Sequence, residues 1–402
     1  MKMKKIIILF WILLGAVTVY GQQTIDYILK ARAFSEVGKP EQAITLLNRA
    51  ISETKESRLF FERAEANILK GDYSAAISDY NEADKLTSSS GEYGLARIYA
   101  LKGDARTALY HLELSMNSPF KKSEKQILLD PAFSTIDNRQ EWRQFWKREW
   151  YSKAEKSISE IEYYVSVGKI DDARDLVTDL KKSFDDNPDI LYAESVVNVA
   201  TGKYSEAIKI LSGLSSTNPG NEKYLRLTAK AQTGASDPAG ASTTYSQLLA
   251  SGVADAELLI LRADCYRKTG ETDKAMGDVR KYLEIYPENR TALSMAGKLE
   301  SSSGDNLQAL EYYSKNLKLH PNDPQCYIDR ANSYFISKSW DLAINDYSMS
   351  LDLKPANSDV WLNKGIALLN SGKVEDACHD FRISFRQGNK RVADYISRNC
   401  IK

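Results

Sequence analysis

Side chains that commonly carry out catalysis are few and scattered in this chain. His111, His320 and His379 lie far apart in the sequence, and none has a nearby Ser, Cys or carboxylate in the pattern of a nucleophile and its base. The segment from Ser118 to Lys121 fits S-x-x-K, but the S-D-N and K-T-G elements that accompany this motif are missing. A phosphate-binding glycine loop is also missing, and Cys and His do not form the short-spaced pairs of zinc sites. We therefore expect a binding protein without catalytic residues, cofactor or metal.

The most regular feature of the sequence is an alanine that recurs every 34 residues. Seven alanines follow this interval without a break: Ala173, Ala207, Ala241, Ala275, Ala309, Ala343 and Ala377. The same phase continues upstream at Ala43, Ala76 and Ala108, and a longer interval then separates Ala108 from Ala173. A period of this length is typical of small helical hairpins, which must stack on neighbours to bury their apolar faces. The spacing therefore predicts an all-α solenoid with an extended binding surface.

Other residue types lie at fixed distances from this repeat alanine. Most repeats have a glycine five residues before it, where the chain turns and a positive φ is needed, as at Gly372 before Ala377. A small residue twelve positions before the alanine, such as Gly365, lets paired helices approach closely. An aromatic or branched residue follows four positions later, such as Phe381, on the same helical face as the alanine. The pattern indicates one helix-turn-helix unit per repeat.

These positions make the chain resemble the tetratricopeptide repeat (TPR) family. The last repeat matches best, with Trp361, Gly365, Leu368, Gly372, Ala377 and Phe381 on the family pattern. The preceding repeat offers Tyr327, Ala331, Tyr334, Ala343, Tyr347 and Pro355, with Lys338 in place of the turn glycine. The weakest repeat is that of Ala241, whose turn reads GASDPAG and is expected to be looser. The resemblance implies a right-handed α-solenoid of TPR helix-turn-helix repeats with a C-terminal capping helix.

The sequence divides into five expected segments. They are a signal peptide (1–21), an N-terminal block of three repeats (22–117), a degenerate helical junction rich in Trp (118–151), a C-terminal block of seven repeats (152–388) and a capping helix (389–402). Three lysines, an apolar run and Val19-Tyr20-Gly21 have the order of a secretory signal, and the run is short for a membrane span. We expect cleavage and a periplasmic or secreted product without a later transmembrane segment; an uncleaved anchor is the alternative.

The junction contains an unusual aromatic spacing. Trp142, Trp146 and Trp150 recur every four residues, which predicts one buried stripe on a helix that runs on into the repeat of Ala173. The simple interpretation is a degenerate helical pair that joins the two blocks. The alternative is that part of the stripe stays exposed to receive a partner.

The resemblance also implies where a partner would bind. In TPR proteins the first helix of each repeat lines the concave face, and counting from the repeat alanine places Tyr192, Lys223, Arg226, Lys230, Arg267, Lys298, Asn332 and Phe335 along it. Five of these eight are basic, so we expect the groove to attract a protein or peptide with acidic groups. Asp264 and Glu257 lie among them and favour the opposite interpretation, a solvated face that binds nothing.

The cysteines and the charge balance complete the expectations. Exported bacterial repeat proteins often end as this chain does, and we hypothesise a Cys378–Cys400 disulfide that ties down the cap; two unpaired thiols are the alternative. Cys265 and Cys326 are expected to be separate packing residues. The 54 basic and 54 acidic residues cancel, which argues against nucleic acid. Two function classes remain: a protein-interaction scaffold of the cell envelope, and an envelope module that recognises glycan or peptidoglycan through Tyr192 and Phe335.

Overall fold

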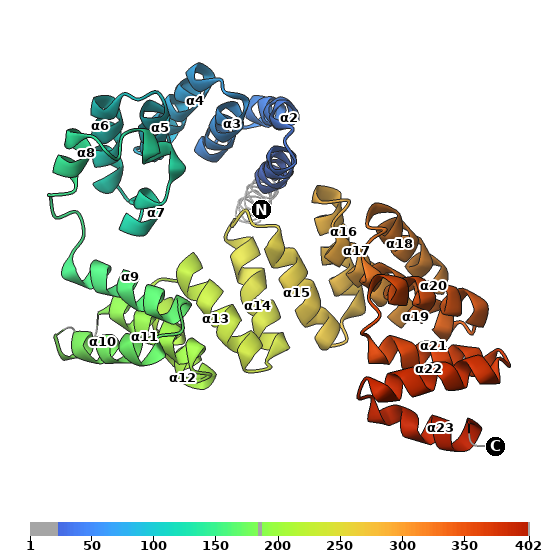
Figure 1. Ribbon diagram of the computed structural model, residues 1–402. Helices are drawn as coiled ribbons and strands as arrows, with labels where there is room; N and C mark the ends of the chain where they lie inside the picture. The colour runs from blue at the N-terminus through green and yellow to red at the C-terminus, as the bar shows by residue number, and fades with distance from the viewer. Residues whose placement is uncertain (1–22, 184–186, 401–402) are drawn as a thin grey trace, which may run out of the picture. The chain divides into compact units, whose positions relative to one another are not determined.

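The computed structural model describes residues 23–183 and 187–400. The expected signal peptide, residues 1–21, lies outside the described residues. Within them every regular element is a helix (Figure 1), so the predicted all-α fold class is confirmed. The chain divides into two compact units, with the boundary between Leu258 and Leu259. The segment boundaries expected at 117, 151 and 388 lie inside these units and stay predictions.

The helices of the first compact unit follow one another with short connections. They are the helix over residues 23–36, α2 (Pro40–Glu53), α3 (Ser57–Lys70), α4 (Tyr73–Leu86), α5 (Glu92–Leu101), α6 (Ala105–Met116), α7 (Glu124–Leu128), the 3-10 helix η1 (Pro131–Thr135), α8 (Gln140–Phe145), α9 (Lys153–Ser166), α10 (Ile170–Ser183), α11 (Pro188–Ala200), α12 (Tyr204–Thr217), α13 (Glu222–Gly234) and α14 (Pro238–Ala250).

The unit boundary falls inside α15 (Glu257–Lys268), and the second compact unit continues the same alternation of paired helices. Its further elements are α16 (Thr272–Ile285), α17 (Arg290–Ser302), α18 (Asn306–Leu319), α19 (Pro324–Ile336), α20 (Trp340–Leu353), α21 (Ser358–Asn370), α22 (Val374–Arg386), the 3-10 helix η2 (Lys390–Val392) and α23 (Ala393–Asn399). In both units, a repeat consists of a first helix and a second helix that carries the repeat alanine.

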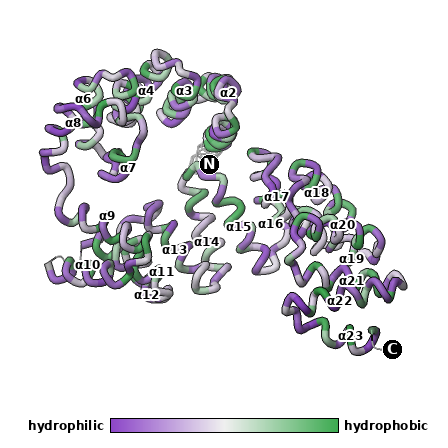
Figure 2. The backbone as a smooth tube through the Cα atoms, in the orientation of Figure 1, coloured by the Kyte–Doolittle hydropathy of each residue, from purple (hydrophilic) through white to green (hydrophobic). Residues whose placement is uncertain are grey.

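The repeat alanines are fully buried in both units. All ten, from Ala43 to Ala377, have no exposed surface. The ring four residues after the alanine lies over the small residue twelve before it: a Cβ added to Gly365 would come within 2.5 Å of the Phe381 ring. Hydrophobic and hydrophilic residues alternate along the helices accordingly (Figure 2). Small residues at these positions therefore set how closely the two helices of a hairpin approach.

The turn inside each hairpin keeps one backbone conformation even where glycine is replaced. The turn glycines, such as Gly372, have positive φ, and Ser236 and Lys338 adopt φ 58° at the corresponding positions of two other repeats. The turn of the Ala241 repeat, expected to be looser, thus has the same conformation as the others. Asp237 also caps its second helix by accepting a hydrogen bond from Gly240 N at 2.9 Å.

A buried ion pair joins the two helices in four of the repeats. A cation thirteen residues before the repeat alanine meets an aspartate three residues after it, and we call this pair the hairpin clasp. The clasps are Arg63–Asp79, Arg262–Asp278, Arg330–Asp346 and Lys364–Asp380. In the Arg330 clasp, Nε and Nη2 donate to the two carboxylate oxygens of Asp346 at 2.7 and 2.8 Å. Such a two-point contact fixes the orientation of both side chains.

The junction differs from its prediction. Trp142 lies in α8, but this helix ends at Phe145, and α9 begins separately with Ser152 as its N-cap, so the expected continuous helix through three tryptophans is wrong. The Trp150 indole N–H donates to the Phe145 carbonyl at 2.8 Å, and the same carbonyl accepts a backbone hydrogen bond from Arg148 N at 3.3 Å. Trp142, Trp146 and Trp150 still pack in one cluster, against α5 and α6. The interpretation of the tryptophans as packing residues is the one that this cluster favours.

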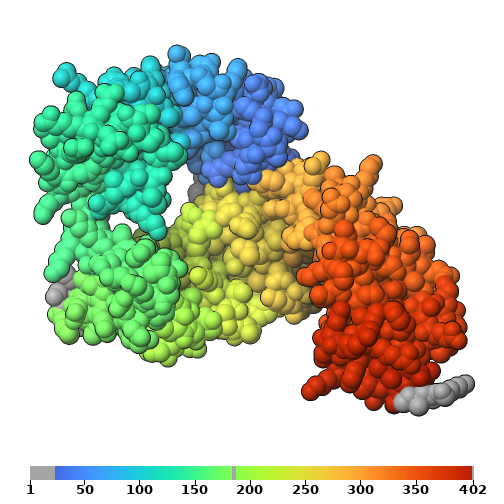
Figure 3. All heavy atoms as spheres, viewed as in Figure 1, coloured from blue at the N-terminus to red at the C-terminus, as the bar shows by residue number. Residues whose placement is uncertain are grey.

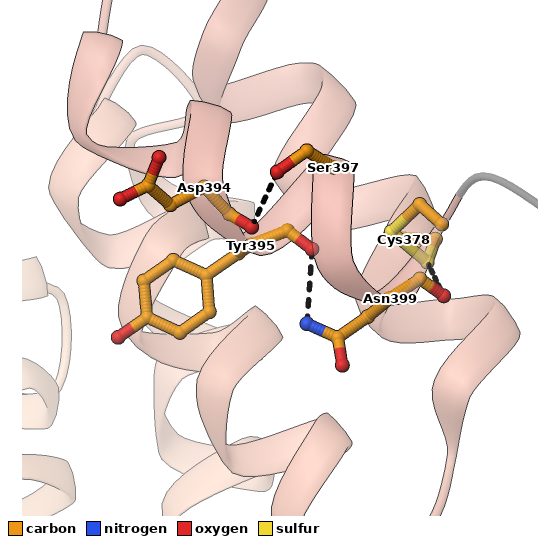
Figure 4. Close-up of a disulfide and its surroundings, with 6 residues drawn as sticks. Cys378, Asp394, Tyr395, Ser397 and Asn399 are labelled. Atoms are coloured by element: carbon orange, nitrogen blue, oxygen red, sulfur yellow. Dashed lines mark hydrogen bonds between the residues drawn. A yellow bond between two sulfur atoms is a disulfide. The ribbon is translucent and has the colours of Figure 1, made fainter.

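The C-terminal end of the chain covers the last repeat. Val392 and Phe381 are buried together, with Tyr395 and Ile396 of α23 packed against them. The sulfur atoms of Cys378 and Cys400 are bonded, across 22 positions of sequence (Figure 4). Cys265 and Cys326 are buried, and neither belongs to a disulfide. The helix α23 thus closes the apolar end of the second unit.

We expect the Asp346→Ala substitution to lower the free energy of unfolding of the α19–α20 hairpin by about 3 kcal/mol, because it leaves the Arg330 guanidinium partly buried without its partner. Native-state hydrogen exchange of the α19 and α20 amides measures this change. The matched control is Asp341→Ala, whose carboxylate is 81% exposed in its pair with Lys373 and should change stability by less than about 0.5 kcal/mol. Equal effects of the two substitutions would contradict the clasp.

The Lys364 clasp predicts a pH dependence. Burial raises the pKa of Asp380, and Lys364 offsets this only in part; the ammonium lies 3.2 Å from Oδ2, which has no hydrogen bond. The folded state therefore binds the Asp380 proton more tightly than the unfolded chain, and this residue makes stability fall as pH rises through the carboxyl range.

A guanidinium contacts both carboxylate oxygens, so Lys364→Arg should lower the pKa of Asp380 and raise the free energy of unfolding by about 1 kcal/mol at pH 7.5. The gain should shrink at pH 4.5. Urea unfolding at the two pH values measures it, with Lys373→Arg in the exposed pair with Asp341 as the control. A gain that is the same at both pH values would refute this account.

Candidate functional site

A cavity lies in the first compact unit, on the first helices of the three N-terminal repeats. It has a volume of about 780 Å³ and is lined by residues of the helix over 23–36, of α3 and of α5, together with the segment that leads into and out of α7. We call it the N-terminal groove. Its lining residues are Ile28, Arg32, Ser57, Arg58, Phe61, Glu62, Glu65, Thr87, Ser90, Tyr93, Arg97, Phe120, Lys122, Gln126, Asp130 and Ala254.

The repeat register explains which side chains enter this groove. Ile28, Phe61 and Tyr93 each lie fifteen residues before their repeat alanine, and they form an apolar row along three successive first helices. A polar row, made of Arg32, Glu65 and Arg97, lies eleven residues before the same alanines. Positions four apart share a helical face, so each of the three N-terminal repeats contributes one apolar and one charged side chain to the groove.

Arg97 organises the charges at one end of the groove. Its Nη1 donates to both oxygens of Glu65, at 2.7 and 2.9 Å, and its Nε lies 3.0 Å from Asp130 Oδ2. Burial lowers the pKa of Arg97, but Glu65 and Asp130 raise it by more, so the net shift is upward. The Tyr80 hydroxyl also donates to Glu65, from behind the groove wall. These contacts hold the guanidinium in a fixed position.

The groove also has a second arginine with a fixed partner, Arg32 at its other end, and an aromatic surface at Tyr93, beside Asp130. Arg32 donates to Glu62 of α3 through Nε, at 2.9 Å. Burial raises the pKa of Tyr93, and the hydrogen bond from its hydroxyl to Asp130 adds to the shift. The Lys122 ammonium lies 5.7 Å from the centre of the Tyr93 ring. The groove thus combines apolar contact area with polar groups whose orientation is set by their neighbours.

This arrangement suits binding. The acidic and basic groups form ion pairs with one another, and none adjoins a nucleophile in a catalytic pattern. In the part of the chain that the structure describes, no three His, Cys, Asp or Glu side chains are grouped as metal ligands. Nor does any described helix combine the length and apolarity needed to cross a bilayer. An elongated molecule with apolar side chains and a polar backbone fits the two rows.

Four of the predicted groove residues lie in the first unit, away from this cavity. Tyr192 is only 9% exposed, and the Lys223 ammonium lies 3.9 Å from the centre of its ring. Burial raises the pKa of Tyr192 to about 12. Arg226 pairs with Glu222 and with Asp255, at 2.8 and 2.9 Å. Lys230 is exposed.

The other four predicted residues lie in the second unit, and their side chains have partners of their own. Arg267 pairs with Asp264 at 2.7 Å, and Lys298 with Asp329 at 3.3 Å. Asn332 accepts a hydrogen bond from the Tyr347 hydroxyl at 2.7 Å. The Phe335 ring packs edge-on against Trp340, with their centres 5.2 Å apart. We call the five predicted basic residues the basic strip: Lys223, Arg226, Lys230, Arg267 and Lys298. Most of them have acidic partners, and the role of the strip in binding stays a prediction.

The N-terminal groove was predictable from the repeat register, although the candidate binding residues were placed only in the later repeats. The same count from the repeat alanine that selects Tyr192 and Lys230 in the later repeats selects Phe61 and Arg32 in the first three. The ion pairs of the groove were harder to predict, because Asp130 belongs to the irregular junction. Its meeting with Arg97 depends on how η1 packs against α5.

Comparison with known proteins gives consistent results. The family model described as tetratricopeptide repeat matches residues 28–91 and 227–290. DnaJ homolog subfamily C member 3 of Gallus gallus is 26% identical over 222 residues, which are 48% of this chain and 43% of that protein. The human protein SGT1 homolog is 26% identical over 149 residues, 37% of this chain and 41% of its own. The chain thus spans less than half the length of these curated relatives.

The fold also occurs in solved structures. The C-terminal part of a TPR repeat-containing protein from Cytophaga hutchinsonii superposes with a TM-score of 0.50 and 14% identity, over 59% of this chain and 98% of that one. At this identity the likeness concerns the arrangement of helices and not the residues of the groove.

Proposed function

This chain is a tetratricopeptide repeat protein, and we propose that it is a non-enzymatic scaffold whose N-terminal groove binds a peptide segment of another protein. Proteins of this family mediate protein–protein interactions. The observation that carries the proposal is the pairing of two rows along three repeats, apolar at Ile28, Phe61 and Tyr93 and polar at Arg32, Glu65 and Arg97. A peptide in a non-helical conformation presents side chains and backbone groups alternately, which suits such rows.

The acidic partner expected for the basic strip is less well supported than a peptide in the N-terminal groove. Of the strip's five cations, Arg226, Arg267 and Lys298 have acidic partners. The glycan alternative depended on stacking by Tyr192 and Phe335, and Tyr192 is buried. We therefore favour a protein or peptide ligand.

We further propose that the protein works outside the cytoplasm, as part of a cell-envelope assembly. The N-terminal sequence has the order of a secretory signal, and the Cys378–Cys400 disulfide suits an oxidising compartment. Two signals of different kinds, one in the sequence and one in the side-chain contacts, thus support export to the periplasm or beyond.

The groove can be tested with peptides selected from a displayed random library on the purified protein. We expect Phe61→Ala to raise the Kd of a selected peptide at least tenfold, since a central aromatic contact is lost. The matched control is Phe335→Ala, which should leave the Kd within twofold. The double variant Lys223→Glu/Lys230→Glu tests the basic strip. If it weakens binding while Phe61→Ala does not, the N-terminal groove is not the site.

Thiol titration tests the disulfide and with it the proposed compartment. The unreduced protein, exported by its own signal and then unfolded, should have two reactive thiols, those of Cys265 and Cys326. Reduction should expose two more and destabilise the cap by about 3 kcal/mol, the chain-entropy value for a loop of this size. Four thiols before reduction would refute the bond.

A further inference from the structure

A segment of the chain itself touches the N-terminal groove. Arg58 Nη1 donates to the carbonyl of Gly252 at 2.9 Å, and Arg32 Nη1 donates to the carbonyl of Ala254 at 2.6 Å. Residues 253–255 have no regular secondary structure, and they connect α14 to α15. Two arginines on successive first helices thus hold two carbonyls that are two residues apart. All of these residues belong to the first compact unit, whose atoms run from blue to yellow in Figure 3.

The side chains of this segment also fit the groove. Ala254 lines the cavity and packs against the cluster that contains Ile28. Gly252 has φ +84°, a backbone conformation that favours glycine, and a Cβ there would be in ordinary contact with Arg58 Nη1 at 3.6 Å. Glycine therefore suits the conformation in which the Gly252 carbonyl meets its donor.

The far side of the segment is held by a residue of the predicted basic strip. Arg226 Nη2 lies 2.9 Å from Asp255 Oδ2, and Asp255 Oδ1 accepts a hydrogen bond from Glu257 N at 2.9 Å. Arg226 thus helps to position the segment, a role that its place in the repeat register did not predict.

We infer that residues 251–256 occupy one end of the N-terminal groove as an internal pseudo-ligand, and that a partner peptide of the same kind displaces them. The inference deepens the proposed function: the ligand is a non-helical segment with small side chains. Arg58 and Arg32 bind it by donating hydrogen bonds to alternate backbone carbonyls. A tethered segment acts at a high effective concentration, so it raises the apparent Kd of a free peptide in inverse proportion to the fraction of molecules in which the groove is unoccupied.

The test uses variants of the segment, and the two single variants leave the groove residues of the three N-terminal repeats unchanged. Ala254→Arg places a third cation beside Arg32 and Arg58, and Asp255→Ala removes the tether to Arg226. The probe is a fluorescein-labelled peptide with the sequence of residues 250–257, and its Kd is measured by fluorescence anisotropy on the full chain. The matched control is Ala239→Arg, which adds the same side chain to an exposed position of α14.

Both segment variants should bind the probe at least tenfold more tightly than the unaltered protein, which is about 1.4 kcal/mol. The Ala239→Arg control should match the unaltered protein, and adding Arg58→Ala to Ala254→Arg should abolish the gain. Equal Kd values for the unaltered protein, the two segment variants and the Ala239→Arg control, or no binding to either segment variant, would overturn the inference. Library-selected peptides that still depend on Phe61 would then keep the proposed function, so the two failures can be told apart.

Discussion

The contact that everything else in this protein depends on is the one between the repeat alanine and the first helix of its hairpin. At Ala377, as at the other nine, no surface is left exposed, and the ring of Phe381 fills the space over Gly365. A larger side chain at either small position would push the helices apart. Since each hairpin is the platform for the next, an error in one spacing would be passed along the stack.

The clasps show how polar groups take part in this packing. Arg63, Arg262 and Arg330 each meet an aspartate that is almost fully buried, and each satisfies both of its oxygens. Lys364 meets Asp380 with a single ammonium and leaves Oδ2 without a hydrogen bond. The same position of the repeat thus accommodates either arginine or lysine, and these two residue types differ in how well they satisfy a desolvated carboxylate.

The sequence predicted the local features of the fold well, because they depend on residues close together in the chain. Alanine spacing identified every hairpin, although Ser236 and Lys338 adopt a glycine-like turn that their residue types do not indicate. The predicted helix through Trp142, Trp146 and Trp150 was too long. The helix α8 ends at Phe145, and the two later tryptophans join the same cluster as Trp142 without continuing the helix. The two rows of the N-terminal groove follow the repeat register and were predictable, whereas the pair of Arg97 with Asp130 was not, because Asp130 lies in the irregular junction.

The covered end of the second unit has a consequence for self-association. A stack of hairpins presents at its last repeat an apolar surface that resembles the one each repeat offers to its neighbour, and a second chain could continue the stack there. Here α23 lies over Phe381, and the bond between Cys378 and Cys400 prevents that helix from leaving. The surface through which a second chain could continue the stack is therefore covered, by side-chain packing and by a covalent bond together.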